Sequence, residues 1–173
     1  DDVARALEGK DILVQAAATT SGAGDIVNKP YYHVTDNALM NSHLFRQCYE
    51  NELEHVVFFS CTTMYQSSTE PVKEEDFDGE IVDKYFGVGW TKVYIEKLCE
   101  FYSRIGKTKY TVLRHSNIYG PYDKYDLEKS HVFGATVAKV MAAEDKVSVW
   151  GDGSDERDLL YVSDLVDFVK LAI

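Results

Sequence analysis

Residues 55–65, His-Val-Val-Phe-Phe-Ser-Cys-Thr-Thr-Met-Tyr, join an apolar run directly to a cluster of polar side chains. The run at residues 55–60 predicts a buried strand of a parallel sheet. Open α/β sheets bind their ligands at the carboxyl ends of such strands. The stretch therefore predicts a central strand followed by a candidate functional edge, although an ordinary Ser/Thr-rich turn would have the same composition.

Strands and helices alternate along the chain around this stretch. Short apolar runs predict three strands, at residues 11–18, 55–60 and 108–113. Apolar residues at helical spacing predict two long helices, at residues 31–51 and 89–105. This alternation is typical of a parallel sheet with crossover helices on its faces.

The pattern changes after Gly120-Pro121. Beyond it the sequence predicts a helix over residues 131–143, a short strand over 147–150 and a helix over 163–173 that is capped by Ser163. The chain is therefore expected to begin within a doubly wound sheet and to end within a smaller C-terminal part.

The composition excludes several classes of function. The 18 basic and 29 acidic residues give a net charge of −11, which repels polyanions, so neither nucleic acid nor an anionic membrane is an expected partner. The three cysteines have no metal-ligand spacing and fit a reduced, cytoplasmic protein. No apolar run reaches the ~20 residues that span a bilayer, and no signal peptide opens the chain. We expect an acidic cytoplasmic protein without a metal site.

The sequence contains no glycine-rich turn of the kind that binds the pyrophosphate of a dinucleotide. The first predicted strand is followed by Ala-Thr-Thr-Ser-Gly-Ala-Gly at residues 18–24, which has neither the G-x-G-x-x-G nor the G-x-x-G-x-x-G spacing. Either the N-terminal strand–helix units are missing, or the chain is not a dinucleotide-binding protein. The remaining motifs favour the first interpretation.

Three further motifs lie at the ends of predicted elements. Residues 87–96 are Gly-Val-Gly-Trp-Thr-Lys-Val-Tyr-Ile-Glu and place Lys92 in the first turn of a helix, where the helix dipole disfavours a cation. This position suggests a function for Lys92, although an ordinary surface lysine is the alternative. Residues 114–121, Arg-His-Ser-Asn-Ile-Tyr-Gly-Pro, directly follow a strand. In residues 150–164, Arg157 either neutralises the neighbouring acids or offers a guanidinium fork to a phosphate.

In this order, the segments resemble the extended short-chain dehydrogenase/reductase family of sugar-nucleotide epimerases and dehydratases. The shared pattern is a strand with Ser/Thr-x-x-x-Tyr, a helix-opening lysine, R-x-x-N-x-Y-G-P and W-G-x-G-x-x-x-R-D-x-x-Y-V-x-D. Similarities at residues 16–22, 37–42 and 130–132 make the GDP-L-fucose synthases the most similar group within the family. The resemblance implies a Rossmann-like doubly wound parallel sheet that lacks its N-terminal strand–helix units, plus part of a smaller C-terminal substrate-binding region.

The resemblance also implies a division of the chain and a partner. Residues 1–120 would be the C-terminal portion of an NAD(P)-binding domain, and residues 121–173 an incomplete sugar-nucleotide-binding region whose elements can interleave with the first. The helices at residues 31–51 and 89–105 are the pair that this family packs against a second subunit, which implies a homodimer. An apolar stripe that faces the core would show the same spacing.

The family transfers a hydride to or from nicotinamide with a Ser/Thr–Tyr–Lys set. The tyrosine acts as acid and base, and the lysine lowers the tyrosine pKa and holds the nicotinamide ribose. Lys92 matches the lysine, but the tyrosine position is Val88, which has no proton to donate. The Ser/Thr position is Cys61, whose thiol is a weak hydrogen-bond donor and a better acid than a hydroxyl. Tyr85 could approach only from an irregular helix start.

The remaining site positions are implied by the same resemblance. Fucose synthases move protons beside a 4-keto group with a cysteine and a histidine. These positions are Thr63 and His131 here, with Cys61 two residues from the first. The alternative for His131 is a histidine that only begins a helix, and the match of its flanking residues favours the functional interpretation. The cofactor positions are Ala17, Ala18, Asn37 and Lys92, and the sugar-nucleotide positions are Asn117, Lys139, Trp150 and Arg157.

The leading hypothesis is an NAD(P)-dependent epimerase/reductase, with NAD or NADP as cofactor, that acts on a 4-keto-6-deoxy sugar of a nucleotide diphosphate. One alternative is a non-catalytic protein that binds a sugar nucleotide or dinucleotide and has lost the tyrosine at Val88. A 4,6-dehydratase is a weaker alternative, because its usual Asp-Glu pair is replaced by Thr62-Thr63.

Overall fold

The computed structural model describes residues 2–20, 28–127, 130–149 and 151–173. Its main sheet is parallel and has the order β1-β2-β3. The strands are β1 (Ile12–Gln15), β2 (His55–Phe59) and β3 (Lys109–Leu113). Each lies within its predicted apolar run, so the predicted parallel sheet is confirmed. Gly22 and Gly24, which follow the first predicted strand, lie outside the described residues.

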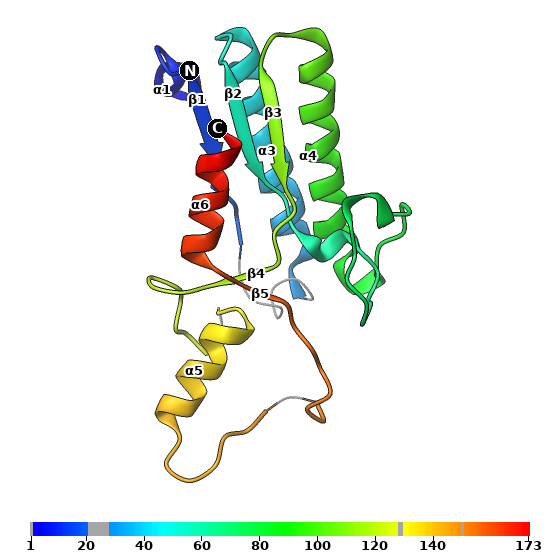
Figure 1. Ribbon diagram of the computed structural model, residues 1–173, viewed down its shortest axis with the longest axis vertical. Coiled ribbons are helices and arrows are strands. Elements are labelled where there is room, and N and C mark those ends of the chain that lie inside the picture. The colour runs from blue at the N-terminus through cyan, green and yellow to red at the C-terminus, as the bar shows by residue number, and fades with distance from the viewer. Residues whose placement is uncertain (1, 21–27, 128–129, 150) are drawn as a thin grey trace.

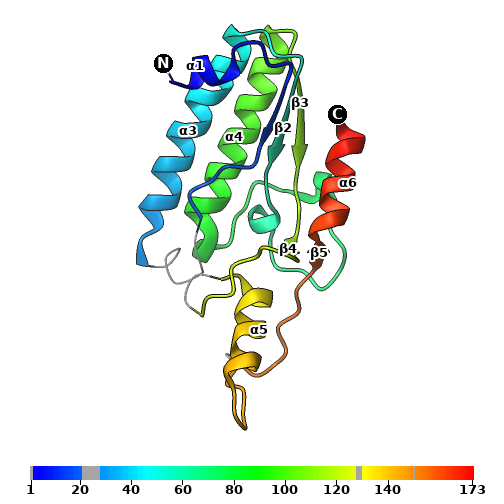
Figure 2. The same ribbon diagram turned by 90° about the vertical axis from the view of Figure 1, so that its left-hand side faces the viewer.

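Two long helices cover one face of this sheet. They are α3 (Pro30–Glu50) and α4 (Phe86–Ile105), and both run beside the strands in Figures 1 and 2. A 3-10 turn (Asp83–Tyr85) leads directly into α4, which therefore begins three residues before the predicted position. A short helix that the sequence analysis did not predict, α1 (Asp2–Leu7), packs against α3.

The side chains of β2 alternate between two cores. Val56 and Phe58 point toward α3 and α4, where the Phe58 ring meets the Phe45 ring edge-on at 5.7 Å. Val57 points to the opposite face and packs with Leu165. Each such burial stabilises the fold by about 1.5–3 kcal/mol. Because successive strand residues face opposite sides, a strand that is buried on both faces must be apolar throughout.

After β3 the chain forms a smaller C-terminal part and then returns to the sheet. Helix α5 (Val132–Ala142) lies beyond the carboxyl ends of the strands, whereas α6 (Val162–Ala172) covers the face of the sheet opposite α3 and α4 (Figure 2). A second, parallel pair of strands connects the two parts. The elements are β4 (Asn117–Tyr119), α5 (Val132–Ala142), β5 (Leu159–Tyr161) and α6 (Val162–Ala172). With helices on both faces, the doubly wound α/β fold is confirmed, while the domain boundary at residue 120 stays a prediction.

Two local predictions are wrong. Residues 147–149 form no strand, and Trp150 lies outside the described residues. Strand pairing occurs instead at β5, where Asn117 binds the carbonyl of Asp158 through its backbone and its side chain. Ser163 does not cap α6, because β5 runs directly into a helix whose N-cap is Tyr161, and the Ser163 hydroxyl contacts Asp164 at 3.4 Å.

None of the helices in the described ranges has both the length and the apolar character needed to cross a membrane.

Candidate functional site

The carboxyl ends of β2 and β3 lie side by side and lead into polar residues. Pairing extends one residue past β2, where the amide of Ser60 donates to the carbonyl of Leu113 at 2.9 Å. Cys61 then follows β2, and His115 follows β3 two residues after Leu113. In Figure 1 the strands point toward β4, β5 and α5, so this edge of the sheet faces the C-terminal part of the chain.

Lys92 reaches this edge from the second turn of α4. Its ammonium donates to the carbonyl oxygen of Phe59 at 2.8 Å and lies 4.9 Å from the centre of the Phe58 ring. Burial lowers the Lys92 pKa, and the nearby Cys61 and Glu96 oppose that shift. A partly desolvated cation is thus held beside a thiol.

Cys61 and Thr63 contact each other in the turn after β2. The sulfur of Cys61 lies 2.8 Å from the hydroxyl oxygen of Thr63, and the turn is anchored by the buried Met64. Gly89 lets α4 approach closely, because a Cβ there would lie 3.3 Å from the carbonyl oxygen of Thr63 and 2.8 Å from Ile81. Thr63 is the position that the resemblance implies for a proton-transfer cysteine, and it therefore contacts Cys61, the cysteine that is present.

Val88, the residue at the implied tyrosine position, is part of helix α4. It lies one turn before Lys92, and helix α4 is regular there. Tyr85 is the N-cap residue of α4, about 10 Å along the helix from Lys92. Tyr85, the last residue of the 3-10 turn that leads into α4, therefore lies about two helix turns before the lysine.

An ion pair behind the edge ties β2, β3 and α4 together. The Arg114 guanidinium donates to both carboxylate oxygens of Glu96, the shortest contact being 2.7 Å, and the side chains are only 18% and 13% exposed. Ser60 donates to the same carboxylate, and Arg114 also donates to the hydroxyl of Tyr65 at 2.7 Å. The bond to Glu96 raises the Arg114 pKa above its ordinary value. Arg114 is therefore a structural cation.

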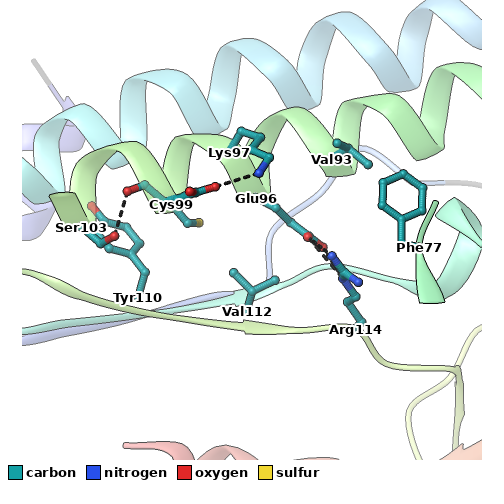
Figure 3. Close-up of a pocket in the computed structure, with 10 residues that line it drawn as sticks. Phe77, Val93, Glu96, Lys97, Cys99, Ser103, Tyr110, Val112 and Arg114 are labelled. Carbon is teal, nitrogen blue, oxygen red and sulfur yellow. Dashed lines mark hydrogen bonds and ion pairs between the residues drawn. The ribbon is translucent and has the colours of Figure 1, made fainter. Parts of the chain in front are cut away.

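Figure 3 shows the same ion pair at the wall of a cavity of about 410 Å³ between α4 and β3. The wall also includes Tyr110, whose buried hydroxyl has no hydrogen-bond partner among the residues that the structure describes. Lys92, Cys61 and His115 are not part of this wall. The cavity therefore lies behind the candidate site and does not contain it.

The predicted cofactor positions follow β1. The side chain of Asn37 accepts from the amide of Thr19 at 2.9 Å and donates to the Thr19 carbonyl at 2.9 Å. The side chain of buried Gln15 donates to the carbonyl of Ala17 and accepts from the amide of Ala17, both at 3.2 Å. Ala17 and Ala18 are exposed. The result is a fixed backbone with small side chains, which a flat ring can approach closely.

The predicted sugar-nucleotide positions are only partly brought together. Pairing of β4 with β5 places Asn117 beside Asp158 and hence near Arg157, whose guanidinium contacts the carboxylate of Asp155 at 3.3 Å. Lys139 lies at the other end of α5 from His131, about 12 Å away along the helix, and lines a hollow of about 290 Å³. Trp150 lies outside the described residues.

One residue at this edge was not selected from the sequence. His115 packs edge-on against the Phe59 ring with 5.9 Å between ring centres. Burial lowers the His115 pKa, and the charges of Lys92 and His131 lower it further. His131 is the N-cap residue of α5 and is exposed. The only signal in the sequence was the place of His115 directly after a predicted strand.

A family model described as the NAD dependent epimerase/dehydratase family matches residues 1–173. The GDP-L-colitose synthase of Yersinia pseudotuberculosis is 28% identical over 170 residues, which are 94% of this chain and 55% of that enzyme. The GDP-L-fucose synthase of Azorhizobium caulinodans is 28% identical over 169 residues, which are 94% of this chain and 53% of that enzyme. The chain thus spans about half the length of the curated relatives it matches.

Solved structures agree on the fold. A GDP-D-glycero-L-gluco-heptose synthase from Campylobacter jejuni, determined in the presence of NADPH, has a TM-score of 0.87 at 21% identity and covers 98% of this chain and 61% of its own. A UDP-glucuronic acid 4-epimerase from Bacillus cereus, in complex with UDP-glucuronic acid and NAD, has a TM-score of 0.82 at 25% identity and covers 99% of this chain and 52% of its own.

Proposed function

The chain belongs to the NAD-dependent epimerase/dehydratase family, and from this premise we propose that it is part of an NAD(P)-dependent nucleotide-sugar epimerase/reductase. The proposed substrate is a 4-keto-6-deoxy sugar on a nucleotide diphosphate. The observation that carries the proposal is the sheet edge at which the Cys61–Thr63 pair lies beside the desolvated Lys92. The two named GDP-sugar synthases among the relatives support the substrate class.

The residues present fit the nicotinamide half of a dinucleotide. Exposed Ala17 and Ala18 lie in the segment after β1, whose backbone is held by the side chains of Gln15 and Asn37, so a planar ring can lie against them. When bound, the nicotinamide would supply or accept the hydride. Lys92 would bind the adjacent ribose, because its ammonium is held at the same edge by the Phe59 carbonyl. Solved relatives that hold NADPH or NAD support this cofactor class.

Proton transfer beside a ketone is the chemistry that these side chains support best. A carbon next to a keto group can lose a proton, because the resulting charge is delocalised to oxygen as an enolate. In our proposal Cys61 and His131 move that proton. The Lys92 ammonium lies at the same edge of the sheet, where a cation stabilises the negative charge of the enolate oxygen. Val88 cannot supply the proton that accompanies hydride transfer, so epimerisation is the better supported half of the reaction.

Exchange with heavy water tests this function. The full-length protein is incubated in D₂O with a GDP- or dTDP-4-keto-6-deoxy sugar, and the sugar mass is followed. We expect deuterium to enter the carbons beside the keto group, and we expect His131→Ala and Cys61→Ser to slow that entry by about 100-fold. A protein that binds the sugar nucleotide but incorporates no deuterium would instead be the non-catalytic binding protein.

We also propose that the protein is a cytoplasmic homodimer that associates through the outer surfaces of α3 and α4. Large apolar side chains are exposed along these helices, at Tyr32, Leu39, Trp90, Tyr94 and Phe101. Light scattering should give twice the mass of the full-length chain. In Leu39→Glu/Phe101→Glu we expect a monomer, and an unchanged mass would assign these side chains to another role.

A further inference from the structure

His115 is a titratable side chain at the candidate site that the proposed function does not use. It lies two residues after the end of β3, and the residue is partly exposed. The ring packs edge-on against Phe59, the residue whose carbonyl holds the Lys92 ammonium. His115 and Lys92 therefore share one rigid support.

A hydrogen bond determines which ring nitrogen of His115 is available. Nδ1 lies 2.8 Å from the carbonyl oxygen of Ser116. A carbonyl can only accept, so Nδ1 carries the proton and Nε2 of the neutral ring carries a lone pair. In the described part of the chain, no group is hydrogen-bonded to Nε2. The ring thus presents a free proton acceptor.

The surrounding charges keep His115 neutral at physiological pH. Burial lowers the His115 pKa most, and the Lys92 ammonium from α4 and His131 from the start of α5 lower it further. The hydrogen bond to the Ser116 carbonyl opposes this shift but does not reverse it. Phe59 on β2 brings no charge, and the nearby guanidinium of Arg114 is neutralised by Glu96. At pH 7 the ring is therefore in the form that can accept a proton.

We propose that His115 is a third proton-transfer residue, whose Nε2 removes a proton from a carbon beside the keto group of the bound sugar. This role rests on the proposed function. The C–H bond breaks, its electron pair moves through the new C=C bond to the keto oxygen, and the proton forms the His115 imidazolium. Return of a proton to carbon restores the ketone and the neutral ring. The Lys92 cation at the same edge favours the negative oxygen.

The D₂O exchange assay with His115→Gln tests this role, because glutamine keeps polarity and size but has no basic nitrogen. We expect exchange to slow by about 100-fold or more. In the unmodified protein, the exchange rate should rise with pH as His115 loses its proton, with a midpoint below the ordinary histidine pKa, and this limb should vanish in His115→Gln. Circular dichroism and sugar-nucleotide binding check that the variant is folded.

Two outcomes distinguish a failure of the proposed function from a failure of the role of His115. Absence of exchange in the unmodified protein would overturn the proposed function and this role with it, whereas unchanged exchange and an unchanged acid limb in His115→Gln would overturn the role of His115 alone. A ¹⁵N NMR titration of the histidines gives a readout without substrate. We expect the Nδ1–H tautomer and a depressed pKa for His115, and an Nε2–H tautomer would overturn the inference.

Discussion

Replacing Glu96 by glutamine removes the negative partner of the partly buried Arg114 and hardly changes the size of the side chain. In the native protein the carboxylate accepts three hydrogen bonds from Arg114 and one from Ser60. Removal of one partner of a fully buried pair costs about 3–5 kcal/mol. Because solvent still reaches the two side chains, which are 18% and 13% exposed, we reduce the expected loss to about 2 kcal/mol.

Urea denaturation of the full-length protein measures this loss, provided that a single transition reports the domain. Glu100→Gln is the matched control, since it removes a carboxylate from the next turn of α4 that pairs with the exposed Lys97 and Arg104. We expect Glu100→Gln to change the unfolding free energy far less than Glu96→Gln. Equal losses in the two variants, or a loss below about 1 kcal/mol in Glu96→Gln, would refute the view that this ion pair holds the sheet edge together.

Three further outcomes are expected. In the full-length protein, Lys92→Met should weaken NADPH binding about tenfold in a fluorescence titration, as loss of a charged hydrogen bond predicts, and an unchanged affinity would remove Lys92 from the cofactor site. Iodoacetamide at pH 8 should label Cys61 before Cys48 and Cys99, because burial raises the pKa of these two thiols to about 12. Mass spectrometry measures the order of labelling, and earlier labelling of Cys48 or Cys99 would contradict the prediction. Asn37→Ala should weaken NADPH binding through loss of the backbone bonds to Thr19, whereas the exposed control Asn51→Ala should leave binding unchanged.

Much of the fold followed from local patterns. The apolar run of β2 predicted a strand because both of its faces are buried, Val56 and Phe58 against one layer and Val57 against the other. The long helices were predictable for a similar reason, since residues three or four positions apart, such as Ile95 and Cys99, share the buried face of α4. The family was recognisable because its motifs are short segments at strand ends, and the family match confirms it.

The individual site residues were named from those motifs and stay predictions. They could be named from the sequence because the residues of each motif lie close together along the chain. Lys92 lies in one helix turn, and Cys61 and Thr63 lie in one short turn after β2, so the relevant spacing is visible in the sequence. Asn37 was likewise placed by a motif on α3, whereas its bonds to Thr19 connect residues 18 positions apart and had no local signal.

What the sequence by itself determined is therefore the order of strands and helices, the family, and the residue types at each strand end. Only the tertiary structure decided which of those residues meet. Pairing of β4 with β5 joins residues about 40 positions apart and depends on the Asp158 carbonyl, which is why the strand was wrongly assigned to residues 147–150. In the same way, the neighbours of His115 come from three other segments. Phe59 contacts its ring, and the charges of Lys92 and His131 lower its pKa. Only the packing of a sheet against its helices brings such distant segments together around one imidazole ring.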